Sequence, residues 1–256
     1  MKAVILAGGY GTRLAELTKE VPKPLVEVGG QPILWHILKI YAAQGLNEFV
    51  IALGYKGHQI KDYFLNYHAR NSNVTVDLGT GQTIFHGGDL LDWKITLVDT
   101  GGETMTGGRI RRLAPFLGQE TFMMTYGDGV ADVDLQLLLR YHRLKGGLVT
   151  VTAVHPTSRY GKLELDCDGK VQRFSEKPEF VEDWINGGFF VMEPAFLDLI
   201  SGDDVILERK PLEIATENDQ FHAYRHDGFW HCMDTLRDRQ HLNQLWSTGN
   251  APWKIW

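Results

Sequence analysis

The stretch KAVILAGGYGTR, residues 2–13, decides how the chain can fold, because it joins an apolar run to a turn that contains three glycines. The run KAVIL is typical of a strand that is buried on both faces of a sheet. Gly8, Gly9 and Gly11 allow backbone N–H groups to face an anion at close range, because no Cβ stands in the way. A plain glycine-rich turn from a strand into a helix is the alternative interpretation.

Short apolar runs alternate with helical patterns over the first 154 residues. The strand-like runs are 2–6, 48–53, 95–99, 121–126 and 148–154. The spacing of apolar residues predicts helices at 32–45, 58–67 and 134–147. In the first of these, Pro32 is expected at the first helical position and Gly45 just after the end. Such alternation predicts an α/β fold, a Rossmann-like, doubly wound, mainly parallel sheet with helices on both faces.

The pattern changes near residue 155, where short strand-like segments separated by turns take over. These segments are 160–166, 168–178 and 185–193, and helices are expected near 194–200, 211–217 and 235–246. The sequence contains no internal repeat, linker or low-complexity segment. We therefore expect one domain over residues 1–256, with a β-rich C-terminal half that begins at residue 155.

Composition excludes several classes of protein. With 256 residues, 43% of them hydrophobic and 23% charged, the chain is long enough for a substantial core. Its formal net charge of −6 argues against a nucleic-acid partner, which normally requires a basic excess. Cys167 and Cys232 lie far apart without any C-x-x-C, so neither a disulfide framework nor a cysteine zinc site is indicated. No segment approaches the roughly 20 apolar residues of a membrane span, and we expect a cytoplasmic protein.

Named catalytic and phosphate motifs can be tested directly against the sequence. A P-loop is absent, and a dinucleotide-binding G-x-G-x-x-G would place Leu14 where its third glycine should stand. The chain has neither a G-x-S-x-G elbow nor H-E-x-x-H spacing among its ten histidines. His36 lies in an apolar helical pattern and is expected to be packed rather than catalytic.

Two basic residues follow the glycine turn, and they give the chain a family resemblance. Arg13 comes directly after the turn, and Lys23 stands between Pro22 and Pro24, whose rings restrict the local backbone. Taken alone, a lysine between prolines would be a solvated loop charge. Together with GGYGTR, however, the pattern resembles the sugar-phosphate nucleotidyltransferases, which join a sugar 1-phosphate to a nucleoside triphosphate and release pyrophosphate.

The resemblance implies roles for particular residues across the glycine turn and beyond it. Arg13 and Lys23 would be catalytic cations at the phosphates. The nucleotide would contact Leu6, Ala7, Gly8, Gly9, Gly11, Thr12, Arg13, Lys23, Thr104, Arg109, Gly127 and Asp128. The sugar phosphate would contact Gly161, Glu176, Lys177, Asn186 and Gly187. Residues 1–154 would form the nucleotide-binding half of the domain and residues 155–256 the half that binds the sugar phosphate.

A Mg²⁺ site is also implied, with Asp128 of TYGDGVAD and Asp234 of FWHCMDTLRD as its carboxylates. Carboxylate oxygens are ligands that Mg²⁺ prefers. The alternatives are that Asp128 is a turn residue and that Asp234 caps helix 235–246. For Arg109, the alternative is a solvated basic helix face, which suits Arg111 and Arg112 better.

Longer stretches resemble the members of the family that use CTP and glucose 1-phosphate and make CDP-glucose for deoxysugar or O-antigen-type polysaccharides. These stretches are 97–113, 125–134, 185–194, 228–238 and the ending APWKIW. The alternatives are the same chemistry with UTP or dTTP, and a regulatory relative that binds nucleotide sugars without turnover. We expect a homo-oligomer, with Trp253 and Trp256 of the tail as candidates for an aromatic subunit contact.

Overall fold

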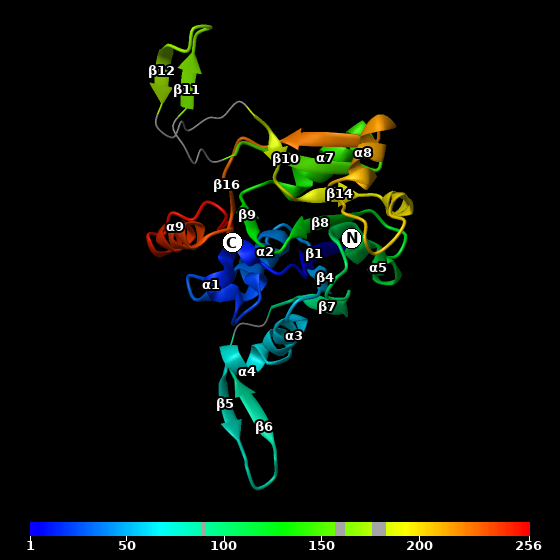
Figure 1. Ribbon diagram of the computed structural model, residues 1–256. Coiled ribbons are helices and arrows are strands. Elements are labelled where there is room, and N and C mark those ends of the chain that lie inside the picture. The colour runs from blue at the N-terminus through cyan, green and yellow to red at the C-terminus, as the bar shows by residue number, and fades with distance from the viewer. Residues whose placement is uncertain (89–90, 157–161, 176–182) are drawn as a thin grey trace.

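The computed structural model describes residues 1–88, 91–156, 162–175 and 183–256. A mixed, mostly parallel sheet lies at the centre of the molecule (Figure 1). In the described residues it has eight strands, in the order β13-β10-β14-β8-β1-β4-β7, with β15 paired to β10. The strands are β1 Ala3–Ala7, β4 Glu48–Leu53, β7 Lys94–Asp99, β8 Phe122–Tyr126, β10 Val149–Val154, β13 Ile185–Asn186, β14 Phe190–Met192 and β15 Phe221–Arg225.

The strand β1 occupies the middle of this sheet and runs parallel to both of its neighbours. Its partners are β4 and β8, and β7 extends the parallel part beyond β4. The strand β14 joins the sheet antiparallel between β8 and β10, and β15 runs parallel to β10. All five strands predicted in the first 154 residues are present, and the expected α/β sheet is confirmed.

Alternate residues of β1 contribute to two hydrophobic cores, one on each face of the sheet. Ile5 packs in a core with α2 (Ile33–Ala42) and α7 (Leu135–Lys145). Val4 packs in a second core with α5 (Thr106–Arg112) and α8 (Lys210–Glu217). Burial of apolar area on both faces explains why β1 is a continuous apolar run rather than an alternating one. Helices cover both faces, as the sequence predicts.

Some element boundaries differ from the predicted ones. Pro32 is the residue before α2 and not its first helical residue, because it pairs in a short strand with Glu27. The segment near 194–200 is a 3-10 helix, Pro194–Leu199, which begins at a proline. The remaining helical segments are η1 Thr12–Leu14, α1 Ala15–Thr18, η2 Lys23–Leu25, α3 Gly57–Leu65, α4 Tyr67–Asn71, α6 Ala114–Leu117 and α9 Leu236–Ser247.

Four two-stranded sheets complete the described structure. They are β2 Glu27–Val28 with β3 Gln31–Pro32, β5 Asn73–Val76 with β6 Thr83–His86, β11 Lys162–Leu165 with β12 Val171–Ser175, and β9 Gly129–Ala131 with β16 Trp230–Cys232. The β5–β6 and β11–β12 hairpins project from opposite ends of the molecule (Figure 1). A search of the described helices finds none with the length and apolar character that crossing a membrane requires.

The C-terminal tail packs on its own chain. Trp253 is fully buried, and its indole N–H donates to Nδ1 of His36 over 3.3 Å. His36 is also fully buried, as expected, and its Nε2 lies 2.8 Å from the carbonyl oxygen of Val28. Trp246 and Trp256 place their rings near the same imidazole. The expectation that Trp253 offers an aromatic contact to another subunit is therefore wrong, because this side chain is part of the core.

Candidate active site

The site begins where β1 and β8 end. Because the two strands are adjacent and parallel, the glycine turn after β1 and the turn after β8 lie at the same edge of the sheet. The backbone N–H of Gly127 donates to the carbonyl oxygen of Leu6 over 3.0 Å, which holds the two turns together. A Cβ at Gly127 would lie only 3.0 Å from that oxygen, so a larger residue there would crowd the two turns. Asp128 is thereby held beside the glycine turn.

A small sheet brings Asp234 to Asp128, although the two are far apart in sequence. The strand β16 pairs antiparallel with β9, so that Cys232 lies opposite Gly129. The next residue, Met233, donates its N–H to the carbonyl oxygen of Asp128 over 2.9 Å. Asp234, the residue after Met233, therefore lies next to Asp128.

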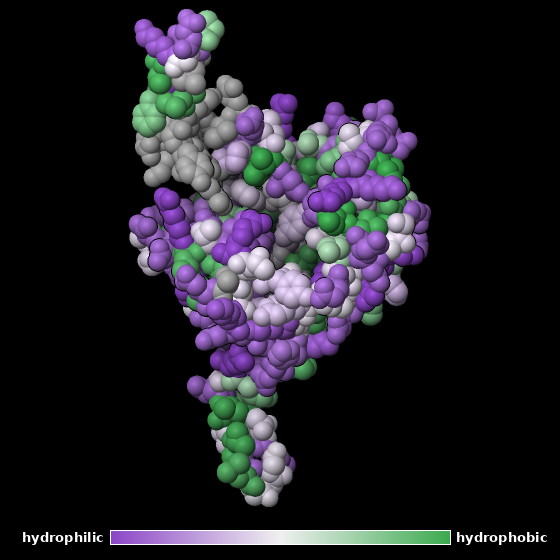
Figure 2. Space-filling view, viewed as in Figure 1, coloured by the Kyte–Doolittle hydropathy of each residue, from purple (hydrophilic) through white to green (hydrophobic). Residues whose placement is uncertain are grey.

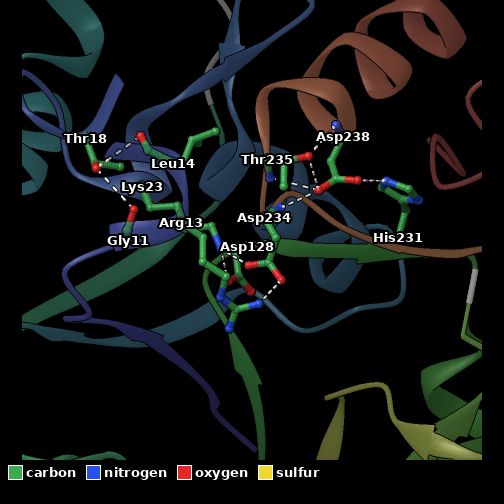
Figure 3. Close-up of polar contacts among 10 residues, drawn as sticks. All are labelled: Gly11, Arg13, Leu14, Thr18, Lys23, Asp128, His231, Asp234, Thr235 and Asp238. Atoms are coloured by element: carbon green, nitrogen blue, oxygen red, sulfur yellow. Dashed lines mark hydrogen bonds and ion pairs between the residues drawn. The ribbon is translucent and has the colours of Figure 1, made fainter. Parts of the chain in front are cut away.

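Lys23 links the two carboxylates (Figure 3). Its Nζ lies 2.7 Å from Oδ2 of Asp128 and 2.7 Å from Oδ1 of Asp234. The residue is only 9% exposed and starts η2, directly after Pro22. Burial alone would lower the pKa of Lys23, but the charge of Asp128 and the hydrogen bonds to both carboxylates raise it above the ordinary lysine value. The interpretation of Lys23 as a solvated loop charge is wrong.

Arg13 contacts the same cluster from its outer side. Its guanidinium donates to Oδ2 of Asp234, the oxygen that does not contact Lys23 (Figure 3). The Arg13 side chain is 73% exposed, whereas that of Asp234 is 14% exposed. One carboxylate is therefore held between a buried ammonium and an exposed guanidinium, and the guanidinium can turn to a ligand in the solvent.

Asp234 does not cap the following helix. Thr235 is the N-cap of α9, and its hydroxyl accepts from the N–H of Asp238 over 3.2 Å. The Asp238 carboxylate accepts in return from the N–H of Thr235 over 2.8 Å, which completes a capping box. Because its neighbours satisfy the helix end, the Asp234 carboxylate points to the cations (Figure 3).

Arg109 is buried beneath the glycine turn and is 5% exposed. Its Nη1 donates to the carbonyl oxygen of Leu53 at 3.1 Å, to Oγ1 of Thr100 at 2.8 Å and to the carbonyl oxygen of Gly101 at 2.7 Å. Its Nη2 donates to the carbonyl oxygen of Gly102 at 3.0 Å. The guanidinium thus joins the ends of β4 and β7 below the turn.

The other two arginines of this helix differ from Arg109 in exposure. Arg111 and Arg112 are exposed, and they contact the carbonyl oxygen of Ser201 and the carboxylate of Asp203. The interpretation as a solvated basic face therefore holds for Arg111 and Arg112 and is wrong for Arg109.

A cavity of about 450 Å³ opens above these residues. All twelve residues expected at the nucleotide line it, and Asp234 lines it with them. It is also lined by Tyr10, Pro24, Gly102, Glu103, Met105, Thr106 and Tyr126.

The expected sugar-phosphate residues that the structure describes, Asn186 and Gly187, are not among the residues that line this cavity. Asn186 donates its side-chain N–H to the hydroxyl of Tyr126 over 3.3 Å, and Tyr126 lines the cavity. Gly187 accepts from the indole N–H of Trp230 over 2.7 Å. Gly161, Glu176 and Lys177 lie outside the described residues.

Known proteins resemble this chain over its whole length. A model of the nucleotidyl transferase family matches residues 2–231. The chain belongs to this family. It is 48% identical over 257 residues to the glucose-1-phosphate cytidylyltransferase of Salmonella typhi, and the match covers 100% of both chains. It is 44% identical to the probable glucose-1-phosphate cytidylyltransferase of Bacillus subtilis (strain 168), again over 100% of both chains.

Solved structures share the fold of this chain. HddC from Yersinia pseudotuberculosis superposes with a TM-score of 0.70 at 21% identity, covering 96% of this chain and 99% of that one. A UDP-glucose pyrophosphorylase complexed with UDP-glucose superposes with a TM-score of 0.68 at 16% identity, covering 97% and 98%. At such low identity, these two structures show only that this chain shares their fold.

Sequence reasoning missed several residues of the nucleotidyltransferase cavity. The hydroxyl of Tyr10 donates to Glu103, and that of Tyr126 donates to Glu208 over 2.6 Å. Tyr10 does carry a signal, since it stands between the glycines of the opening turn. For Tyr126 the only signal is its place at the end of a strand.

Cys232 is the other residue that sequence reasoning set aside. Its sulfur and one oxygen from each of Asp128 and Asp234 all lie within 4.8 Å of one another, a grouping that can hold a metal ion. Burial and the charge of Asp128 raise the pKa of the thiol, so it is a neutral neighbour of the two carboxylates. The hard oxygen donors of this nucleotidyltransferase therefore come from the aspartates.

Proposed function

We propose that the protein transfers a cytidylyl group from CTP to α-D-glucose 1-phosphate, giving CDP-glucose and pyrophosphate. Two curated relatives with matching full length, at 48% and 44% identity, carry this assignment. The observation that supports it in this chain is that one cavity gathers the glycine turn, two cations and two carboxylates. The expected product suits deoxysugar or O-antigen-type polysaccharide synthesis.

The nucleotide lies against the turn after β1 in this proposal. Gly9 supports this placement, because a Cβ there would meet nothing within 4 Å and the space above it belongs to the cavity. Thr104 and Tyr10 line the same cavity, and the Tyr10 ring centroid lies 5.0 Å from that of Tyr55. A base can therefore stack near aromatic rings while the phosphates follow the turn toward Lys23.

The reaction needs no nucleophile from the protein. A phosphate oxygen of glucose 1-phosphate attacks the α-phosphorus of CTP, and the bond between the α-phosphorus and the bridging oxygen to the β-phosphate breaks. Pyrophosphate leaves with that electron pair. Two anionic substrates repel each other, so Arg13 and Lys23 stabilise the charge at the α-phosphate and hold the reacting atoms in line. The contribution of these side chains is position and charge.

Asp128 and Asp234 would hold Mg²⁺ at the triphosphate. The residues fit such an ion, because two carboxylates and the substrate phosphates supply the oxygen ligands that Mg²⁺ prefers. When bound, Mg²⁺ polarises the phosphate oxygens and neutralises part of their charge. Asp128 and Asp234 would hold it jointly, because the β9–β16 pairing brings their backbones side by side.

The chain would act as one nucleotidyltransferase unit in this account. Residues 1–154 supply the nucleotide side of the cavity, and residues 155–256 supply the sugar-phosphate side. Asn186 supports this division, because it reaches the cavity through Tyr126. Gly187, Gly161, Glu176 and Lys177 are retained as proposed contacts of the sugar phosphate. A cytoplasmic location agrees with two free cysteines.

We also propose that copies of this chain assemble through the β5–β6 hairpin. All eight strand residues of the hairpin are exposed, and an isolated two-stranded hairpin is marginally stable in water. The space-filling view shows the hairpin as a projection with a hydrophobic face (Figure 2). Its exposed apolar residues are Val74, Val76, Leu78, Ile84 and Phe85.

The same chain offers a complementary apolar hollow for this hairpin. A cavity of about 270 Å³ is lined by Phe64, Leu65, Tyr67, His68, Leu91, Trp93, Ile95 and Leu97. Within the described residues, β7 pairs only with β4, and Ile95 and Leu97 of β7 line this hollow. In the assembly, the apolar hairpin of one copy packs into the hollow of a second copy, and the protein is a homo-oligomer.

Product identification tests the proposed reaction. The protein is incubated with Mg²⁺, glucose 1-phosphate and an equimolar mixture of CTP, UTP, dTTP, GTP and ATP, and the nucleotide sugars are identified by mass spectrometry. CDP-glucose should be the main product. UDP-glucose or dTDP-glucose as the main product would favour the alternative pyrimidines, and the absence of any nucleotide sugar would favour a relative that binds without turnover.

A further inference from the structure

The two carboxylates of the site are already neutralised by the protein. Asp128 and Asp234 face the ammonium of Lys23 at 2.7 Å each, and the guanidinium of Arg13 contacts the second oxygen of Asp234. Two negative groups thus meet two positive groups in a cluster that is partly shielded from water. Adding a free divalent cation to such a neutral cluster would leave it with an excess of positive charge.

Lys23 also stands where a cation would bind. One ammonium in contact with an oxygen from each of two carboxylates occupies the position that a shared metal ion takes. The side chain is 11% exposed, so little water is available to replace it at the carboxylates. An ion and the Lys23 ammonium therefore compete for the same two oxygens.

We propose that Lys23 is an internal counter-ion that holds the divalent-cation site closed until the nucleotide arrives. A metal ion that is bound to a triphosphate brings the negative charge of the phosphates with it. The Lys23 ammonium can then pair with the phosphates while the ion binds the two carboxylates. Lys23 moves from the aspartates to phosphate, and no covalent bond forms or breaks in this exchange. The metal ion and the nucleotide therefore bind together, and the metal ion binds only weakly when no nucleotide is present.

This inference rests on the proposed function only in taking Asp128 and Asp234 as metal-binding carboxylates. Its test is therefore made without nucleotide and without turnover. Mn²⁺ replaces Mg²⁺ as the probe, because the electron paramagnetic resonance signal of free Mn²⁺ decreases as the ion binds. The proteins compared are the wild type, Lys23→Ala, Lys23→Met and Arg13→Ala.

The two Lys23 variants should bind Mn²⁺ at least about tenfold more tightly than the wild type, since they free both carboxylates. Lys23→Met keeps the length of the side chain and guards against a loss of packing in Lys23→Ala. Arg13→Ala removes the same amount of charge from the outer oxygen alone, so it should tighten binding less. Adding Asp128→Asn to Lys23→Met should abolish the gain.

A second measurement uses thermal unfolding of the same proteins with and without Mn²⁺. Lys23→Met should have a lower melting temperature in chelator, where the ammonium between the two carboxylates is missing and Arg13 contacts Asp234 alone. Mn²⁺ should restore the melting temperature of this variant more than it raises that of the wild type. The proposal is overturned if both Lys23 variants bind Mn²⁺ within twofold of the wild type or more weakly. An equal gain in Arg13→Ala would also overturn it, because net charge alone would then explain the effect.

Discussion

The Arg109 guanidinium lies directly beneath Gly8, so that a Cβ at Gly8 would come within 2.3 Å of its Nη1. A long side chain can often move away from such a clash. Arg109 cannot do so cheaply, because four hydrogen bonds hold it to the ends of β4 and β7. The glycine turn therefore serves two purposes, approach by a ligand from above and close packing on a buried arginine from below.

Substitutions at Gly8 and Gly9 can distinguish the packing role of the turn from its role in ligand binding. Gly8→Ala should destabilise the protein by about 1–3 kcal/mol through overpacking against Arg109, and it should lower activity as well. Gly9→Ala meets nothing within 4 Å, so it should leave the melting temperature nearly unchanged and raise KM for the nucleotide. Thermal unfolding and steady-state kinetics measure both effects. Equal melting temperatures for the two variants would contradict the packing role of Gly8.

Substitutions can also distinguish the role of the two carboxylates in turnover from the role of the helix cap in stability. Asp128→Asn and Asp234→Asn should each abolish most turnover at saturating Mg²⁺, and the double variant should lose little more, because residues that act as a unit are not additive. Thr235→Ala is the matched control. It removes the N-cap of α9 and should cost about 1 kcal/mol of stability with kcat nearly unchanged. Near-normal turnover of Asp234→Asn would remove this residue from the site.

Acid should weaken the docking of the C-terminal tail through His36. Burial lowers the pKa of this imidazole from 6.5 to about 4, so the unfolded chain binds the proton at a higher pH than the folded one. The contribution of neutral His36 to stability is complete above pH 6.5 and is lost as pH falls toward 4. The full loss is about 3 kcal/mol at about 1.4 kcal/mol per pKa unit.

Urea unfolding at several pH values measures this effect. Other groups also titrate in this range, so the comparison is between the wild type and His36→Gln, which cannot take up the proton. The variant should be less stable at pH 7.5, and the difference from the wild type should shrink as the pH approaches 4. A difference that stays constant over this range would contradict the assignment to His36.

The proposed assembly has a control on another element. Leu78 at the tip of the β5–β6 hairpin is 92% exposed, and Leu144 near the end of α7 is 83% exposed. Leu78→Asp should reduce the molar mass in light scattering after size exclusion, whereas Leu144→Asp should not. A monomeric wild type at micromolar concentration would refute assembly, and an unchanged mass in Leu78→Asp would exclude the tip of the hairpin from the interface.

The sequence predicts the site best where the chemistry is local. The apolar opening strand reveals the glycine turn, and Asp128 directly follows the apolar run 121–126. Lys23 between its two prolines resembles a loop charge when taken alone, and its predicted role came from the family resemblance. Asp234 was reached only through the family resemblance, because the β9–β16 pairing that places it is three residues long. So short a pairing has no pattern that a sequence can reveal.

Burial explains the remaining differences between sequence and structure. Arg109, Arg111 and Arg112 share one helix, and only tertiary packing distinguishes the buried Arg109 from its exposed neighbours. Trp253 looks like an exposed residue of a tail until the tail docks on His36. The β5–β6 hairpin was missed because its strands are short and exposed, so no buried face imposes a clear alternation on them.

The nucleotide preference of the cavity is measured by pyrophosphate release with glucose 1-phosphate and each of CTP, UTP, dTTP, GTP and ATP. The highest kcat/KM is expected for CTP. Moderate use of UTP is compatible with a cytidylyl donor, because the two pyrimidines differ at a single ring position and its neighbouring protonation. A clear preference for GTP or ATP would contradict the assignment of the cavity to a cytidylyl donor.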